Sequence, residues 1–494
     1  MEPPPAPQQE PQPPQDQFVA ALELLKAGKA TEAAWAAESL INGYPELPIG
    51  HILRSMIHEQ KRDLAAAKTE IQAALARAPE DPLCLTTLAR LAFHSGDWDE
   101  ARVTADRIPM DVGVWRDGQL WKARAINALG HPKDALAVVD ALEPATVQQA
   151  IFAAAIEAHL GQDTSARSRL DQALGDGPIK NQVMRRAGFN LAAVCDRLGD
   201  YEAAFVAASK SNAATPRTFD PENWQSKTEG TMATYGQNAY LGMPSQQDPR
   251  AIFLVGLPFS GQLQLERMLG DHPRVGIHQM PRAILKILQH VHAQCLKDGL
   301  SACPELFTEA GNELRAAMSK ADPDASRIVF RAPLLDRVAG VIPLCLPEAM
   351  LLCLRRNPLD TLLAIYFEHL KLSTNPYSTN LIDLLAAYKS HRQLMSHWER
   401  VLPAPMHTVH YESLVFNDLD ARKELFRFLD LPFDPACVVE YSMPTAKNHQ
   451  ERASAPLSDA AWKVDHWKHY AAHLESLKHA INALESGEAP EVGP

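Results

Sequence analysis

The chain of 494 residues is too long for one ordinary core, and we expect two domains of roughly 200 residues each. Its 46% hydrophobic and 22% charged residues are typical of a soluble globular protein. A net charge of −12 without a long basic run argues against nucleic-acid binding, because a phosphate backbone needs clustered lysine and arginine.

Residues 1–16 are rich in Pro and Gln and lack the basic start and apolar stretch of a secretory signal, so we expect a disordered tail. The most apolar later segment, 338–354, is interrupted by Pro343 and Pro347, which argues against a membrane span. Seven scattered cysteines without a CxxC pair indicate neither a zinc site nor a disulfide framework. These features predict a cytoplasmic protein with no integral membrane segment and no bound metal.

The segment 17–214 is alanine-rich, helical in pattern and repetitive. Gly28, Arg62, Gly96 and Gly130 lie 34 residues apart, and an alanine follows each of them five residues later. The register continues less strictly at Gly161 and Gly199. This period, with a small residue at the turn between two helices, resembles the tetratricopeptide repeat. We expect an all-α solenoid of six repeats whose groove binds a segment of a partner or substrate protein, with an anonymous helical bundle as the alternative.

Residues 215–248 are a predicted connector, because prolines recur there and the pattern supports one helix, around Asn223 to Tyr235. The second domain is expected at 249–484, and a second disordered tail at 485–494.

Residues 251–273 carry the clearest local pattern of the second domain. Five apolar residues, Ala251 to Val255, predict a buried parallel strand, which is followed by a glycine turn and a helix. This arrangement binds phosphate, because backbone N–H groups and the positive helix end point at one spot. Gln262 and Leu263 stand where a nucleotide-triphosphate loop needs Lys and Ser or Thr, so hydrolysis of ATP or GTP is not expected.

The loop resembles that of sulfotransferases more closely. In that family it reads Pro-Arg-Ser-Gly-Thr-Thr-Leu and holds the 5′-phosphosulfate of the donor, 3′-phosphoadenosine 5′-phosphosulfate. Pro258, Ser260 and Gly261 match the family loop. Phe259 replaces its arginine, and the two residues after Gly261 replace its two threonines.

The resemblance extends over residues 249–480, in particular to bacterial proteins that join tetratricopeptide repeats to a domain related to tyrosylprotein sulfotransferases. The segment 350–370 resembles the second donor motif. In it Arg356 falls on the arginine that grips the 3′-phosphate, and Ala364 on a serine that shares it. Arg331 falls where relatives have a lysine that steadies the sulfuryl group. The resemblance implies a three-layer, P-loop-like α/β domain with a parallel sheet.

Two further segments of this resemblance concern the donor. Tyr411 matches a tyrosine near the donor adenosine, and Gln450 and Arg452 match a segment that closes over the donor, in which Lys447 replaces a serine. The donor-binding residues implied by the resemblance are Gly256, Ser260, Gly261, Arg356, Tyr411, Gln450 and Arg452.

The base for sulfuryl transfer is not evident. In tyrosine sulfotransferases it is a glutamate eight residues after a His-Pro pair, and counting from His272 gives Met280. The neighbouring His278 and Gln279 are candidate substitutes; the ordinary pKa of a histidine suits a general base, and a structural histidine is the alternative. The catalytic candidates are therefore Arg331 and His278.

Three functions remain open. We favour a catalytically impaired sulfotransferase-like scaffold that acts by protein–protein binding, because the substitutions remove several polar ligands from one site. The first alternative is an active enzyme that moves a sulfuryl group from the donor to a protein hydroxyl, that of tyrosine. The second is a small-molecule or lipid sensor whose pocket has become apolar through Phe259, Leu263 and Met280.

Two other sets of polar residues stand out in the second domain. His466, His469 and His473 include a metal-like helical spacing but no third ligand, so we expect a solvated helix face. Asp360 and Glu368 are expected to be exposed carboxylates that would repel a sulfate donor.

Overall fold

The chain divides into two compact units, one ending at Arg169 and the other beginning at Leu170, and each is described by itself. The computed structural model describes residues 13–143, 145–175, 177–179, 181–241, 250–347, 349–416, 418–437 and 463–486.

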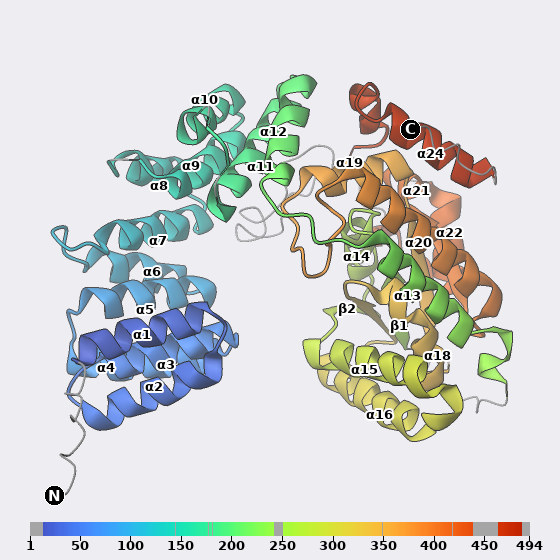
Figure 1. Ribbon diagram of the computed structural model, residues 1–494, viewed down its shortest axis with the longest axis horizontal. Coiled ribbons are helices and arrows are strands. Elements are labelled where there is room, and N and C mark those ends of the chain that lie inside the picture. The colour runs from blue at the N-terminus through green and yellow to red at the C-terminus, as the bar shows by residue number, and fades with distance from the viewer. Residues whose placement is uncertain are drawn as a thin grey trace, which may run out of the picture. The chain divides into compact units, whose positions relative to one another are not determined.

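The first unit is all helical, and its successive helices pack in pairs (Figure 1). They are α1 (Pro14–Lys26), α2 (Ala30–Gly43), α3 (Ile49–Gln60), α4 (Leu64–Arg77), α5 (Pro82–His94), α6 (Trp98–Asp106), α7 (Trp115–Ala128), α8 (Pro132–Asp140), α9 (Val147–His159) and α10 (Asp163–Leu174), which runs into the second unit.

The 34-residue period corresponds to the turns inside these helix pairs, which confirms the repeat array. Gly28, Arg62, Gly96 and Gly130 all have φ between +63° and +92°, the left-handed conformation that lets the chain reverse. The alanine five residues after each turn is 0% exposed, because the paired helices approach too closely there for a larger side chain. Asp63 is one of the N-caps of the second helices, and its carboxylate accepts a hydrogen bond from the N–H of Ala66.

The second unit begins with a further helix pair and continues as an α/β domain (Figure 1). Its helices are α11 (Gln182–Arg197), α12 (Tyr201–Ala213), α13 (Pro221–Thr234), α14 (Gln262–Gly270), α15 (Arg282–Asp298), α16 (Pro304–Ala321), α17 (Leu335–Val338), α18 (Ile342–Cys345), α19 (Pro358–Phe367), α20 (Leu381–Val401), α21 (Tyr411–Val415), α22 (Leu419–Phe428) and α24 (Glu475–Ser486). Short 3₁₀ turns include η6 (His466–Tyr470).

The strands of this unit form one parallel sheet with the order β2-β3-β1-β4-β5. They are β1 (Ala251–Val255), β2 (Val275–Gln279), β3 (Arg327–Arg331), β4 (Met350–Arg355) and β5 (Met406–His410). The strand expected at Ala251 to Val255 is therefore present at the centre of the sheet, and it is buried throughout. Ligands of such sheets bind outside the carboxyl ends of the strands, where the loop after β1 lies.

Helices cover both faces of the sheet, as the expected three-layer architecture requires. Phe253 points to the face covered by α15, α16 and α20, while its neighbours Ile252 and Leu254 point to the face covered by α14 and α22. This alternation of apolar residues on both faces explains why the strand sequence reads as an unbroken apolar run.

The helix pair α11–α12 packs against the α/β domain within the second unit. The side-chain amide of Asn212 donates to the carbonyl oxygen of Tyr366 over 2.9 Å. Buried residues of α11, α12, α19 and the segment around Tyr470 share one hydrophobic cluster. The domain limits predicted above, with a connector at 215–248, remain a prediction.

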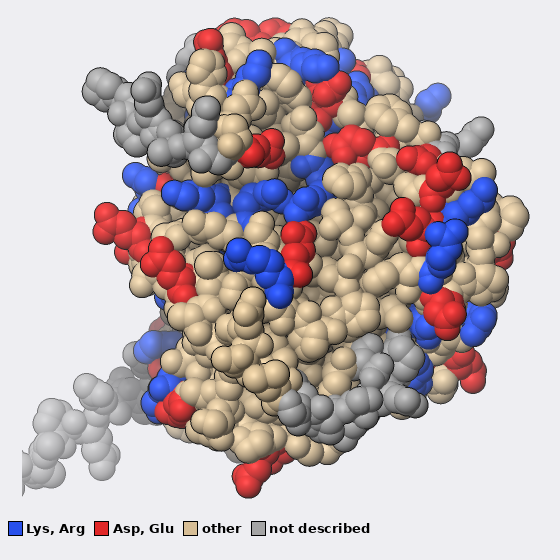
Figure 2. Space-filling view, turned by 90° about the vertical axis from the view of Figure 1, so that its right-hand side faces the viewer, with Lys and Arg blue, Asp and Glu red and all other residues tan. Residues whose placement is uncertain are grey.

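All seven cysteines lie among the described residues, all are buried, and none forms a disulfide. None of the helices in the described part of the chain combines the length and apolar character that a membrane span requires. Figure 2 shows a short band of Lys and Arg side chains on one face, with Asp and Glu side chains around it. The face in this view therefore offers no broad basic surface of the kind that binds a nucleic-acid backbone.

Candidate functional site

The loop between β1 and α14 is shaped by two glycines that no other residue could replace without movement. A Cβ on Gly256 would lie 2.6 Å from Ser260 Oγ and 3.0 Å from the carbonyl oxygen of Leu354. Gly261 has φ +113°, and a Cβ there would lie 2.7 Å from Tyr411 Cδ2. The loop therefore lies directly against β4 and against the start of α21.

We expect Gly261→Ala to lower the free energy of unfolding by about 2–3 kcal/mol, because a backbone penalty and a close contact add together. The matched control is Gly199→Ala, since Gly199 has φ +76° with nothing within 4 Å of a Cβ. The control should cost about 1–2 kcal/mol, the backbone penalty alone. Urea unfolding of the full chain measures both, and equal losses would contradict the role of Tyr411.

The polar side chains of the loop are bonded to the loop itself. Ser260 Oγ donates to the carbonyl oxygen of Leu257 over 2.7 Å. Gln262 Nε2 donates to the same oxygen over 2.7 Å and lies 3.4 Å from that of Gly256. Gln262, which stands where the family loop has a threonine, therefore uses its side chain to stabilise the loop.

Arg356, the residue expected to hold the 3′-phosphate, is also bonded to main-chain oxygens. Its Nη1 donates to the carbonyl oxygen of Phe259 over 3.0 Å, and its Nη2 donates to that of Lys463 over 2.7 Å. The guanidinium lies 4.7 Å from the ring centroid of Tyr411, and Arg356 is only 7% exposed. Arg356 therefore ties the loop to β4 and to the segment before η6.

Arg331 lies at the end of β3 and forms an ion pair with α14. Its Nε is 2.8 Å from Glu266 Oε1, and the Arg331 side chain is 44% exposed. Burial raises the pKa of the Glu266 carboxyl above its ordinary value, and the charge of Arg331 opposes this shift. Arg331 thus presents a cation at the carboxyl end of the sheet, beside the loop.

The candidate base does not face the loop. His278 Nε2 is buried and has no hydrogen-bond partner among the residues that the structure describes, and it would lie 3.1 Å from a Cβ on Gly276, so the ring extends back along β2. Met280, which occupies the position of the family glutamate, is 4% exposed and belongs to the hydrophobic core. The assignment of His278 as a base therefore remains a prediction without a supporting contact.

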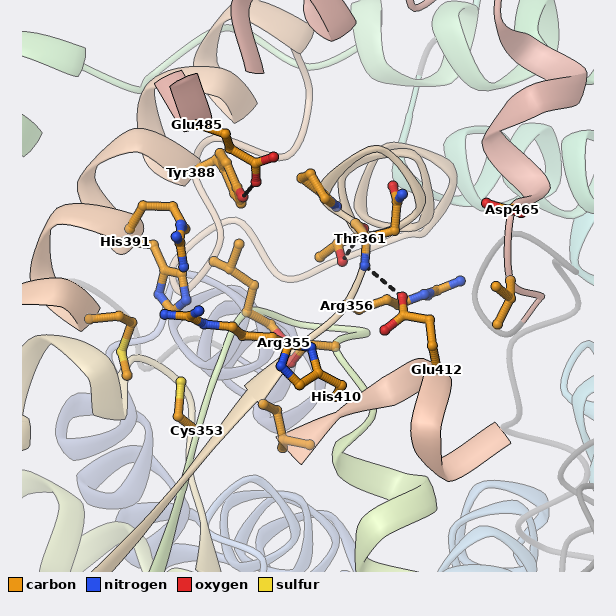
Figure 3. A pocket seen from close by; sticks show the side chains of 18 residues that line it. Cys353, Arg355, Arg356, Thr361, Tyr388, His391, His410, Glu412, Asp465 and Glu485 are labelled. Atoms are coloured by element: carbon orange, nitrogen blue, oxygen red, sulfur yellow. Dashed lines mark hydrogen bonds between the residues drawn. The ribbon is translucent and has the colours of Figure 1, made fainter. Parts of the chain in front are cut away.

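Two cavities of about 390 Å³ each lie at the carboxyl ends of the strands. The first, here called the β4 pocket, is lined by Ser260 and Arg356 together with residues after β4 and from α20. In Figure 3 the side chains of Arg355 and Arg356 leave the strand end in opposite directions, with Arg355 reaching toward His391.

The second cavity, here called the loop pocket, lies between the loop after β1, the segment after β3 and the segment after α19. Gly256, Gly261 and Arg331 line it. The structure thus divides the predicted site residues between two neighbouring cavities, while Tyr411 and His278 line neither. Gln450 and Arg452 lie outside the described residues, as does Lys447.

Asp360 was expected to be exposed, and this expectation is wrong. It is 0% exposed, and its carboxylate accepts hydrogen bonds from the N–H groups of Asp465 over 2.7 Å and Trp467 over 2.9 Å. Burial raises its pKa, while these N–H groups and the charge of Arg356 oppose the shift. Asp360 therefore fixes the segment that precedes and begins η6.

The three histidines near the C-terminus do not form a solvated helix face. His466 Nε2 lies 2.8 Å from Asp196 Oδ1, and the hydroxyl of Tyr470 donates to the same oxygen. His469 stacks on Tyr201, and His473 lies in the turn before α24. No group of three or more His, Cys, Asp or Glu side chains within the described ranges is placed to hold a metal ion.

Sequence reasoning overlooked the arginine and the tryptophan at one side of the loop pocket. The guanidinium of Arg337 lies 4.1 Å from the ring centroid of Trp224, which belongs to α13 in the predicted connector. No local pattern marks this pair, because the two residues are far apart in the sequence.

Comparison with known proteins identifies both parts of the chain. Residues 249–435 match the sulfotransferase family and residues 59–114 match the tetratricopeptide repeat. An uncharacterized protein of Aquifex aeolicus (strain VF5) is 25% identical over 415 residues, which cover 79% of this chain and 53% of that protein. The chain thus spans about half the length of this curated relative.

Solved structures similar to the chain include both kinds of protein. TTC0263, a tetratricopeptide-repeat protein of Thermus thermophilus, is 16% identical with a TM-score of 0.32, covering 36% of this chain and 99% of its own. The sulfotransferase STF9 of Mycobacterium avium is 11% identical with a TM-score of 0.26, covering 63% of this chain and 96% of its own. From the matches of its own sequence, residues 249–435 form a domain of the sulfotransferase family, which the chain joins to tetratricopeptide repeats.

Proposed function

We propose that the chain is a protein-binding scaffold whose sulfotransferase domain has lost most or all sulfuryl transfer. The observation that carries this proposal is the internal bonding of the loop. Ser260, Gln262 and Arg356 all donate to main-chain oxygens of residues 257 to 259 or of residue 463. A donor nucleotide would have to compete with these bonds for each group.

The residues at the site do not fit 3′-phosphoadenosine 5′-phosphosulfate, the donor that sulfotransferases generally use. Phe259 and Leu263 line the loop pocket and offer no polar side-chain atom where the family loop has charged and hydroxyl groups. Ala364 is 0% exposed within α19 and cannot supply the hydroxyl that shares the 3′-phosphate. Met280, at the position of the family's glutamate, belongs to the hydrophobic core and cannot act as a base. We therefore derive no transfer step through this donor.

The repeats offer side chains suited to protein binding. Phe93 of α5, Trp121 of α7 and Phe152 of α9 are half-buried, and each belongs to the first helix of a successive pair. The rings of Phe93 and Trp121 lie 5.5 Å apart, and the guanidinium of Arg124 lies 4.3 Å from Trp121 and 5.8 Å from Phe152. Aromatic and arginine side chains dominate protein interfaces, which supports a protein partner or protein substrate bound through the repeats.

Isothermal titration with 3′-phosphoadenosine 5′-phosphate, the desulfated donor product, tests the proposal on the full chain. We expect no heat up to about 1 mM nucleotide, which corresponds to binding weaker than about −4 kcal/mol. Micromolar binding that Arg356→Ala abolishes would overturn the proposal in favour of an active enzyme.

A restored variant serves as the positive control for this titration. It returns four positions to the family residues, and we expect it to bind the nucleotide at least about tenfold more tightly than the natural chain, since it regains several polar ligands. The substitutions are Phe259→Arg, Gln262→Thr, Leu263→Thr and Ala364→Ser.

The proposed location is the cytoplasm. The support for this proposal is that the seven cysteines, all among the described residues, form no disulfide, as is usual in a reducing compartment.

A further inference from the structure

The loop pocket has walls that suit an apolar ligand. It is about 390 Å³ in volume, which is at the small end of the range for small-molecule sites. Aromatic and aliphatic side chains from three separate segments line it, namely Trp224, Phe259, Leu263, Leu370 and Tyr377. Rings in such a wall can stack on an aromatic ligand.

The same pocket contains a half-buried arginine without a dedicated carboxylate. Arg337 Nη1 donates to Thr228 Oγ1 over 3.4 Å, and its guanidinium also lies over the Trp224 ring. The adjacent Asp336 also lines the pocket and its negative charge acts on Arg337, but its carboxylate is bonded to His391, with Oδ2 2.8 Å from Nδ1. Within the described segments, no carboxylate oxygen lies within 4 Å of the Arg337 guanidinium in an ion pair.

The partial burial of Arg337 favours the binding of an anion in this pocket. Burial lowers the pKa of the guanidinium, because the charged form has lost part of its hydration. The charge of Asp336 opposes this shift only in part, so a ligand anion would add further stabilisation of the guanidinium, with Arg331 as a second cation in the lining. A polyanionic nucleotide fits this pocket poorly, since most of its wall is apolar and the other arginine is already paired with Glu266.

We propose that the loop pocket binds an aromatic monoanion, either an arene carboxylate or an aryl sulfate, with its acid group at Arg337 and its ring against Phe259 and Leu263. The inference rests on the proposed function, because a bound sulfate donor would place its phosphates at the same loop. In this proposal Phe259 and Leu263, which replace polar donor-binding residues of the family loop, form the wall that contacts the ring of the bound anion.

Titration calorimetry of the full chain with three probes of equal ring size tests the proposal. The probes are 2-naphthoate, 2-naphthyl sulfate and the neutral 2-naphthol. We expect at least one anion to bind with a dissociation constant of about 1 mM or below, and about tenfold or more tightly than 2-naphthol. The tighter of the two anions identifies the acid group. Equal binding of 2-naphthol, or binding of none of the three, would overturn the proposal.

A matched pair of variants tests the place of binding. Leu263 lies in the first turn of α14, where glutamate is compatible with the helix, so Leu263→Glu should fold and bring a negative charge to the pocket. We expect it to weaken anion binding by about tenfold or more, while Leu263→Gln weakens it by less than about threefold. Equal effects of the two variants would contradict binding in this pocket.

The variant Arg337→Gln is a second test of the place of binding. We expect it to abolish the preference for the anion over 2-naphthol. Thermal unfolding checks that the variant is folded. Retention of that preference in a folded variant would also overturn the proposal. The failure of the proposed function would be seen separately, as nucleotide binding that depends on Arg356, so the two failures are distinct.

Discussion

Replacing Asp196 by alanine is expected to lower the free energy of unfolding of the second unit by about 3–5 kcal/mol. The Asp196 carboxylate accepts from the Tyr470 hydroxyl and lies 2.8 Å from His466 Nε2, and none of the three residues is more than 3% exposed. Without it, two buried polar groups lose their partner and cannot regain water. The loss should be seen first as faster hydrogen exchange in residues 463–486.

Asp298→Ala is the matched control, because Asp298 lies on the exposed surface of α15 and accepts one exposed hydrogen bond, from the side chain of Gln294. This change should stay within about 0.5 kcal/mol. Urea unfolding of the full chain gives both values. A loss below about 1 kcal/mol for Asp196→Ala would show that the buried network contributes little.

Replacing Glu368 by glutamine is expected to stabilise the second unit in alkaline solution. Burial raises the pKa of Glu368 from 4.5 to about 8, and its buried Oε1 finds no hydrogen-bond partner in the described part of the chain. Between these two values the unfolded chain releases the proton while the folded chain keeps it, so stability falls as the pH rises through this window. Above the upper value the penalty is constant, on the order of 5 kcal/mol at about 1.4 kcal/mol per pKa unit.

The measurement compares the free energy of unfolding at about pH 5 and pH 9, on either side of most of this window. Glu368→Gln should raise the free energy of unfolding by most of this penalty at the higher pH and by little at the lower pH. Glu309→Gln, at an exposed position of α16, is the control and should change neither value by more than about 0.5 kcal/mol. A gain of equal size at both pH values would rule out ionisation as the cause.

The sequence was sufficient for the architecture because the relevant signals are local. A turn residue and an alanine five positions later define each helix pair, and an apolar run followed by glycines defines β1 and its loop. The family resemblance added the parallel sheet, whose pairing joins strands that are far apart in the chain.

The candidate site was harder to predict, since its side chains meet partners from distant segments. Arg356 donates to Lys463, which is 107 residues away, and Asp360 is buried by the main chain at Asp465. His466 was expected on a solvated face and instead contacts Asp196, 270 residues earlier. Spacing identified these residue types, but spacing alone contains no information on which of them would lose contact with water.

The burial of all seven cysteines provides a way to follow the two units independently. Cys84 is the single cysteine of residues 1–169, and the other six lie in the second unit. Burial raises the pKa of both Cys84 and Cys353, so the native thiols react slowly even with a small reagent. A thiol is therefore labelled only when the helices or strands around it open, and labelling rates report the opening free energy of each unit within one intact chain.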